Sequence, residues 1–206
     1  MWPIFLDWIE KERELAGKDA LLNNEPLDTY TMGSIGKVVK ENSWRFVGDD
    51  NGSRRSTGGP SYEIFWSSDT SENRLISMQR IASISGLCYL DKASNMAIHP
   101  KFGPWLSFRA AILFHVGVDI DTYREGHDSA QPVPMPVPNL LSKAEETNAR
   151  KFVAKAFEKK TSKEEDDDVV KCLIAARDSV VLGRDEHRFS DSQLMYHYTK
   201  DIKYLY

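Results

Sequence analysis

The sequence contains few cysteines and no recognisable metal-binding motif. Among 206 residues it has Cys88 and Cys172, and neither belongs to a CxxC pair or a Cys/His cluster. We therefore expect neither a disulfide framework nor a zinc site, and such sparse cysteine is typical of a reducing compartment. The histidines are placed singly, without an HExxH pair, so we expect no metal ion.

Long apolar runs and an excess of positive charge are also missing. No run approaches the ~20 apolar residues of a membrane span. The N-terminal stretch MWPIFLDWIE lacks the basic start and the long apolar core of a signal peptide. The net charge is −4, with no basic stripe, which argues against nucleic acid and acidic membranes as partners. We expect a cytoplasmic protein that does not associate with membranes.

Common catalytic and phosphate-binding motifs are absent as well. There is no GxSxG, and the segment 48–60 (GDDNGSRRSTGGP) has the glycines of a phosphate-binding loop without GxxxxGK[ST] or a following apolar helix. A polar loop is the favoured interpretation of 48–60.

The composition and periodicity that are present predict an α+β domain. Hydrophobic residues make up 41% of the chain, enough for a core, and we expect a single domain over 1–206. Helices are expected at 3–16, 26–41 and 71–88, strands at 62–69, 96–100 and 106–117, a proline-rich crossover at 131–138, and a helical C-terminal third over 139–206, with helices at 139–160, 164–181 and 190–199. The two strands joined by the KFGPW turn should pair antiparallel.

Local patterns add detail to these helices. Leu27, Tyr30, Ile35 and Val38 should form the inward face of helix 26–41. The apolar residues of 71–88 should point inward too: Leu75, Ile76, Met78, Ile81, Ile84 and Leu87. The acidic run 164–168 should cap a helix, where carboxylates meet the positive end of the helix dipole. Ser190 is a candidate N-cap, with Gln193 completing a capping box.

Arg109 lies in the middle of an apolar strand, LSFRAAILF. A buried cation is costly unless it is paired, so this position requires an anionic partner. The partner is either an Asp or Glu of the helical layer, or a ligand carboxylate or phosphate held in a bidentate fork. Arg177 and Arg188 are candidates to join it. His99, before Pro100, is interpreted as a turn or pocket-wall residue rather than a base.

Four segments together resemble the CblC cobalamin-processing proteins, which are cyanocobalamin decyanases and alkylcobalamin dealkylases. The most specific is IHPKFGPWLSFRAAILF (98–114), and the others are RIASISGLCYL (80–90), GHDS (126–129) and ARDSV…HRFSDSQLMYHYT (176–199). Weaker similarity covers 2–40. The resemblance implies a flavin-reductase or nitroreductase-like fold, with a central antiparallel sheet flanked by helices. It also implies that the chain begins after an N-terminal hairpin and strand of that family.

The resemblance further implies an enzyme that binds cobalamin and removes its upper axial ligand, either with glutathione or with a reduced flavin (FMN or FAD). Arg109 and Arg177 would bind the glutathione carboxylates, and no catalytic side chain is identified. Residues implied to line the cobalamin pocket are Ser83 (a histidine in the family), Gly86, Tyr89, Ile98, His99, Phe102, Gly103 and Trp105. Another cobalamin-trafficking protein is an expected partner, and the oligomeric state is a monomer or a ligand-induced homodimer. Two alternatives stay open: a non-catalytic cobalamin carrier or scaffold, and a flavin reductase without cobalamin.

Overall fold

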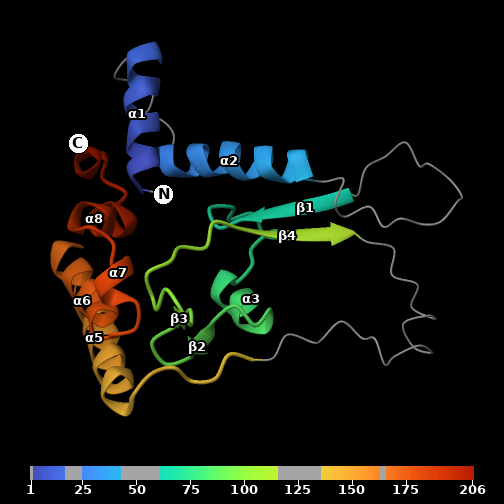
Figure 1. Cartoon of the computed structure of the whole chain (residues 1–206). Helices are drawn as coiled ribbons and strands as arrows, with labels where there is room; N and C mark the ends of the chain where they lie inside the picture. The colour runs from blue at the N-terminus through green and yellow to red at the C-terminus, as the bar shows by residue number, and fades with distance from the viewer. Residues whose placement is uncertain (1, 17–24, 43–60, 116–135, 163–165) are drawn as a thin grey trace, which may run out of the picture. The chain divides into compact units, whose positions relative to one another are not determined.

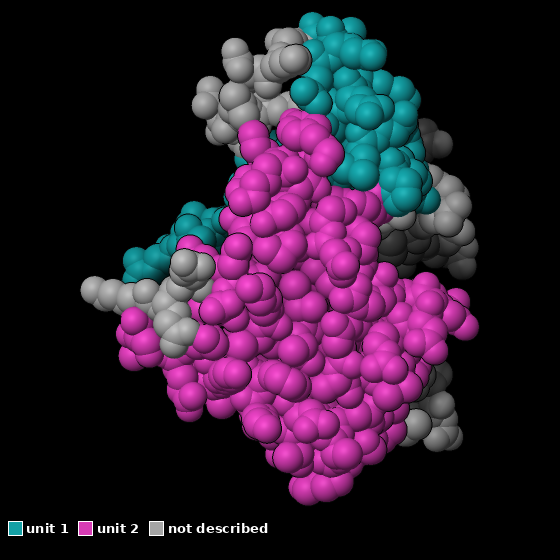
Figure 2. All heavy atoms as spheres, turned by 90° about the vertical axis from the view of Figure 1, so that its left-hand side faces the viewer, with its two compact units in different colours: residues 1, 3–76, 108–133 teal, residues 2, 77–107, 134–206 magenta. Residues whose placement is uncertain are grey.

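A computed structural model of the protein describes residues 2–16, 25–42, 61–115, 136–162 and 166–206 (Figure 1). The chain divides into two compact units (Figure 2). Unit 1 comprises residue 1, residues 3–76 and residues 108–133, and unit 2 comprises residue 2, residues 77–107 and residues 134–206. The expectation of one domain over 1–206 stays a prediction. The loop 48–60, the GHDS segment and residues 131–135 of the proline-rich run lie outside the described residues.

Unit 1 begins with two helices that were both predicted, α1 (Trp2–Ala16) and α2 (Pro26–Asn42). They pack through aromatic rings: the centroid of Tyr30 lies 5.5 Å from that of Phe5 and 5.4 Å from that of Trp8. The expected inward face of α2 is partly wrong. Val39 is buried and Val38 is 58% exposed, because adjacent residues on a helix point about 100° apart.

The strands of unit 1 are β1 (Ser61–Trp66) and β4 (Ala110–His115), which pair antiparallel from Ser61↔His115 to Trp66↔Ala110. The predicted pairing of 96–100 with 106–117 is therefore wrong. The chain reverses within a tighter turn, closed by a bridge between His99 and Gly103, and then runs on to meet β1. The backbone N–H of Ser67 donates to the carbonyl of Arg109 at 2.9 Å and prolongs this pairing.

The predicted helix 71–88 is shortened to α3 (Met78–Ile84). Ahead of it, the Asp69 carboxylate accepts hydrogen bonds from the backbone N–H and hydroxyl of Ser71 and from Nε of Arg74, at 3.0, 2.6 and 2.8 Å. Such local bonds compete with helix formation. Of the six residues expected to point inward, Met78 is buried and Ile76 is half-buried. The other four are exposed by 39–70%: Leu75, Ile81, Ile84 and Leu87.

Unit 2 combines a short hairpin with the C-terminal helices. The hairpin is β2 (Tyr89–Asp91) with β3 (Met96–Ile98), which pair antiparallel. The helices are α5 (Lys143–Thr161), α6 (Asp166–Asp178), α7 (Arg184–His187) and α8 (Asp191–Thr199), followed by the 3-10 turn η2 (Ile202–Leu205). Helices α5 and α6 lie side by side (Figure 1). Three buried residues join hairpin and helices in one core: Ile98, Leu141 and Val180.

The helix caps follow the sequence closely. Ser190 is the N-cap of α8, as predicted, and its hydroxyl accepts from the backbone N–H of Gln193 at 3.2 Å. Asp166, Asp167 and Asp168 occupy the first turn of α6, the place expected for the acidic run. A full capping box, which was not predicted, joins Ser142 and Glu145 at the start of α5. Neither α7 nor η2 was predicted.

The α+β class is confirmed, and the expectation of a central sheet is wrong. The described strands form two separate two-stranded antiparallel sheets. Each joins only short strands, and no third strand pairs with either within the described ranges. Of the helices that the structure describes, none combines the length and the apolar character needed to span a bilayer.

Candidate functional site

The turn 99–103 is held by its own backbone and by the His99 ring. His99 and Gly103 exchange two backbone hydrogen bonds, each 2.9 Å long. Nδ1 of His99 accepts the backbone N–H groups of Lys101 at 3.0 Å and Phe102 at 3.2 Å. Since Nδ1 accepts, the proton of the neutral ring is on Nε2. Burial, and the charge of Lys101, lower the pKa of His99. His99 is thus a neutral turn residue whose Nε2–H is a donor.

The aromatic residues of this turn lie in different environments. Phe102 is 36% exposed, and its ring centroid lies 4.7 Å from that of His99 and 4.9 Å from that of His187. Trp105 is 3% exposed and meets the Phe189 ring edge-on at 6.1 Å. Its buried Nε1–H has no hydrogen-bond acceptor within the described part of the chain. Of the two aromatic residues predicted to form a pocket wall, Phe102 alone presents a ring to the surface.

Behind the turn lies Arg177, in the last turn of α6. Its Nη1 donates to the carbonyl of Pro104 at 3.0 Å, and its Nη2 lies 3.2 Å from Nε2 of His197. The guanidinium carbon is 5.8 Å from the ring centroid of Phe189 and 5.5 Å from that of Tyr198. Among the described residues no carboxylate pairs with it. The Arg177 guanidinium is held by a carbonyl oxygen and an imidazole nitrogen.

A neighbouring arginine shows the contrast. Arg188 donates to both carboxylate oxygens of Asp178, at 2.7 and 3.1 Å, and to Asp191 at 2.8 Å. Those two aspartates raise its pKa, against the effect of burial. A saturated arginine of this kind has little affinity left for a ligand anion, whereas the guanidinium of Arg177 keeps N–H groups for one.

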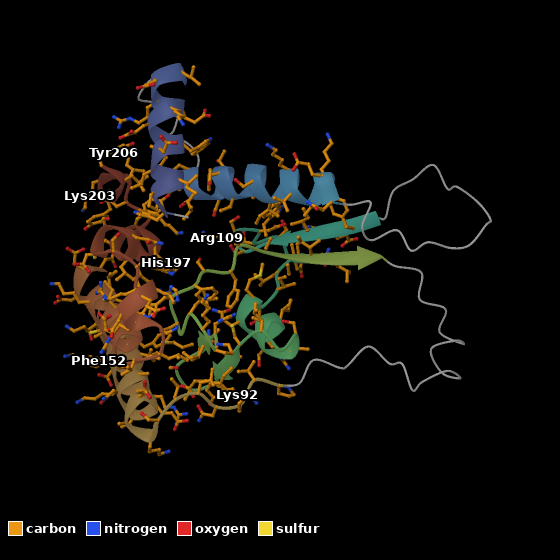
Figure 3. All side chains as sticks on the ribbon, in the orientation of Figure 1. Lys92, Arg109, Phe152, His197, Lys203 and Tyr206 are labelled. Atoms are coloured by element: carbon orange, nitrogen blue, oxygen red, sulfur yellow. The ribbon has the colours of Figure 1, made fainter. Side chains whose placement is uncertain are left out.

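Arg109, labelled in Figure 3, pairs with a carboxylate of the protein itself, which was one of the two partners that the sequence left open. Its Nη1 lies 3.2 Å from Oδ1 of Asp28, in the first turn of α2, and the two side chains are 15% and 17% exposed. Arg109 belongs to unit 1 and Arg177 to unit 2. The arginines expected to bind one ligand together are therefore divided between two units.

The other residues implied for a cobalamin pocket lie in unit 2: Ser83 in the last turn of α3, Gly86 after it, and Tyr89 and Ile98 in the core. Tyr89 and Ile98 are cross-strand partners in the hairpin, and Ile98 is fully buried. Gly86 has φ +72° and follows the end of α3, and its N–H donates to the carbonyl of Ser83 at 3.2 Å. This geometry gives Gly86 a local role, since a left-handed residue is the common way to end a helix.

Neither thiol of the chain is suited to act as a nucleophile. Cys88 is fully buried, and burial raises the pKa of its thiol to about 11. Cys172 is 7% exposed. Because the thiolate is the reactive form and burial disfavours a charge, both thiols are poor nucleophiles. Within the ranges described, no three His, Cys, Asp or Glu side chains gather closely enough to hold a metal ion.

Three residues around Arg177 escaped the sequence analysis: Phe189, His197 and Tyr198. The expected helix 190–199 placed two of them on one element, but no periodicity indicates which face of it meets α6. The RDSV and RFSDSQLMYHYT segments both belong to the resemblance. This shared membership was the one signal in the sequence that could have indicated that the two segments meet in space.

No protein-family model matches the chain, and no curated protein matches it significantly. The resemblance to the cobalamin-processing family therefore rests on the four segments quoted above. Two of them, 98–114 and 176–199, contribute Pro104, Arg177 and His197, which meet in unit 2.

Proposed function

We propose that the protein binds cobalamin and removes its upper axial ligand, with glutathione as the thiol. One observation supports this most directly: Arg177 lies behind the turn of IHPKFGPW, positioned by Pro104 and His197, without a carboxylate partner among the described residues. A guanidinium in this state binds a carboxylate through a charge-assisted fork. The proposal includes a relation to the flavin-reductase-like fold. Both strand pairs are antiparallel, as in that fold, but within the described residues they form two separate sheets rather than one central sheet.

The proposed reaction takes place between the upper ligand of cobalamin and a co-reactant, which is glutathione or a reduced flavin. The glutathione thiolate attacks the carbon of the upper alkyl ligand, the cobalt–carbon bond breaks with its electron pair left on cobalt, and a thioether forms. With a cyano ligand, a reduced flavin would supply the electrons and cyanide would leave. The corrin performs the cobalt chemistry, and the protein supplies position and charge. The buried state of Cys88 and Cys172 is the reason to assign the attacking thiol to a separate molecule.

The test is a visible-spectrum titration of methylcobalamin with the purified protein, with and without glutathione. We expect a spectral shift on binding and loss of the methyl ligand only with glutathione. Arg177→Gln should lower the glutathione-dependent rate by about tenfold or more, as expected for a lost hydrogen bond to a charged group. Lys151→Gln, at an exposed position on α5, is the matched control and should not change it. Absence of any shift would refute cobalamin binding.

A second candidate, a cobalamin carrier without thiol chemistry, is favoured by the ion pair between Arg109 and Asp28. If Arg109 pairs with Asp28 and not with a ligand carboxylate, one of the two expected glutathione anchors is missing. Two variants separate the candidates. For the enzyme, Arg109→Ala abolishes dealkylation, while Asp28→Asn, which removes the carboxylate of this pair, does not lower it. For the carrier, both variants lose only stability, and methylcobalamin shifts the spectrum without losing its methyl group.

A further inference from the structure

The hydrogen bond between Arg177 and His197 has a defined direction. A guanidinium in a protein only donates, because it has no lone pair available for a hydrogen bond and stays protonated. Nε2 of His197, at 3.2 Å from Nη2, must therefore be the acceptor. An imidazole nitrogen accepts only when it has no proton, so the neutral ring has its proton on Nδ1. This assignment is the reverse of that of His99, where Nδ1 is the acceptor.

The two acceptors fix the guanidinium at two atoms. Pro104 O holds Nη1 at 3.0 Å from the turn side, and His197 holds Nη2 from α8. The rings of Phe189 and Tyr198 lie within reach of the same group. A planar cation held at both Nη atoms loses little further freedom when an anion binds. An arginine held by one acceptor would have to be ordered at the moment of binding, which costs free energy.

We infer that His197 is a positioning residue for the Arg177 anion site, with its unprotonated Nε2 orienting the guanidinium toward a ligand carboxylate. The inference deepens the proposed function and rests on it for the identity of the ligand. The sequence did not predict His197, labelled in Figure 3, as a site residue. Its role depends on the contact between α6 and α8 within unit 2.

The first test replaces His197 by residues that do or do not accept a hydrogen bond. In His197→Gln the side-chain carbonyl can accept from Nη2, and in His197→Phe a ring of similar size remains without an acceptor. Calorimetric titration with glutathione should show Phe weakening the affinity about tenfold and Gln less than about threefold, as a lost hydrogen bond predicts. Equal thermal midpoints of the two variants exclude a general loss of stability. Equal affinities of the Gln and Phe variants would overturn the inference.

The second test needs no ligand. Nitrogen-15 NMR of the full chain at neutral pH should show His197 with Nε2 unprotonated and Nδ1 protonated, and Arg177→Gln should shift the Nε2 resonance. A protonated Nε2 in the unmodified protein would refute the inference directly.

The two tests distinguish a wrong role for His197 from a wrong proposed function. If Arg177→Gln abolishes glutathione binding while His197→Phe retains it, the anion site stands and the role of His197 is wrong. If Arg177→Gln binds glutathione like the unmodified protein, or if glutathione does not bind, the proposed site for glutathione is wrong. The NMR result then still decides whether His197 orients Arg177.

Discussion

Gly103 packs against the chain segment that contains Gly183, and Gly183 packs against the segment that contains Gly103. Neither position has room for a side chain. A Cβ on Gly103 would sit 1.8 Å from the carbonyl oxygen of Leu182, and a Cβ on Gly183 would sit 2.7 Å from the carbonyl carbon of Phe102. Both glycines have positive φ, +56° and +70°. The turn 99–103 thus packs backbone to backbone on the segment after α6, and this contact holds the aromatic turn and the end of α6 together.

We predict that Gly103→Ala destabilises the protein by about 2–5 kcal/mol, the sum of a left-handed backbone and an overpacked contact. The clash is with backbone atoms, which cannot rotate away as a side chain does. Urea unfolding measured by circular dichroism gives the change in free energy.

Gly33→Ala is the matched control for that experiment. Gly33 lies inside α2, and no atom lies within 4 Å of a Cβ built there. Alanine at this position should stabilise the protein by up to about 1 kcal/mol, because it favours the helix more than glycine does. If Gly103→Ala were as stable as Gly33→Ala, the backbone contact would be absent in solution.

Asp91 is a buried carboxylate whose partners tie the hairpin to α5. Arg150 donates to it through Nη2 at 2.6 Å and Nε at 3.3 Å, and the Ser94 hydroxyl donates at 2.6 Å. Asp91→Ala should cost about 1.5–3 kcal/mol, since it removes hydrogen bonds to a charged group and leaves Arg150 free to be hydrated. Lys143→Ala removes the pair of an 88%-exposed lysine with Glu146 and should cost less than about 1 kcal/mol. Similar losses in the two variants would contradict this difference.

The same carboxylate predicts an acid dependence. Burial acts to raise the pKa of Asp91, but the bonds from Arg150 and Ser94 outweigh it and lower the pKa. A lowered folded-state pKa contributes stability that is complete above the usual value of about 3.9 and is lost as pH falls below it. Unfolding free energies between neutral and acid pH should therefore fall less steeply in Asp91→Ala than in the unmodified protein.

His99 offers a test that separates its two ring nitrogens. In His99→Asn the side-chain oxygen replaces Nδ1 as acceptor for the turn, an arrangement common in Asx turns. We expect His99→Asn to lose less than about 1 kcal/mol and His99→Ala about 1–2 kcal/mol. Loss of methylcobalamin affinity in His99→Asn, with the turn intact, would show that the Nε2–H contacts the ligand.

The lowered pKa of His99 predicts how the stability of the protein depends on pH. Burial and Lys101 lower its pKa, so the folded protein binds fewer protons than the unfolded chain just below the usual value of about 6.5. Its contribution to stability is complete above that pH and is lost as pH falls through the folded-state value. The difference in unfolding free energy between the unmodified protein and His99→Asn should become smaller as the pH falls. A difference independent of pH would argue against a lowered pKa of His99.

Both cysteines should be unreactive in the folded protein. With Cys88 fully buried and its pKa raised to about 11, the thiolate is scarce at neutral pH. An aromatic disulfide reagent should release its coloured thiol only after denaturant is added, while free glutathione reacts at once. A fast reaction in native buffer would reopen the possibility that the chain supplies its own nucleophile.

Local patterns predicted most of the long helices and helix caps, but not the length of α3, the presence of α7 or the strand partners. The N-cap Ser190, the aspartates at the start of α6 and the bounds of α1 and α2 follow from short-range hydrogen bonds and periodicity, which nearby residues determine. The pairing of β4 with β1, and of β3 with β2, depends on residues far apart in the chain. The KFGPW turn looked like a hairpin connection, but its backbone bonds close within His99–Gly103.

The sequence by itself determined that Arg109 needs an anionic partner and that the chain is α+β. Only the tertiary structure decided which arginine has a carboxylate. Asp28 supplies one to Arg109, whereas Arg177 is held by a carbonyl and an imidazole. The physical reason is that the pairing of a buried charge depends on which side chains meet across elements, and helical periodicity does not encode which faces meet.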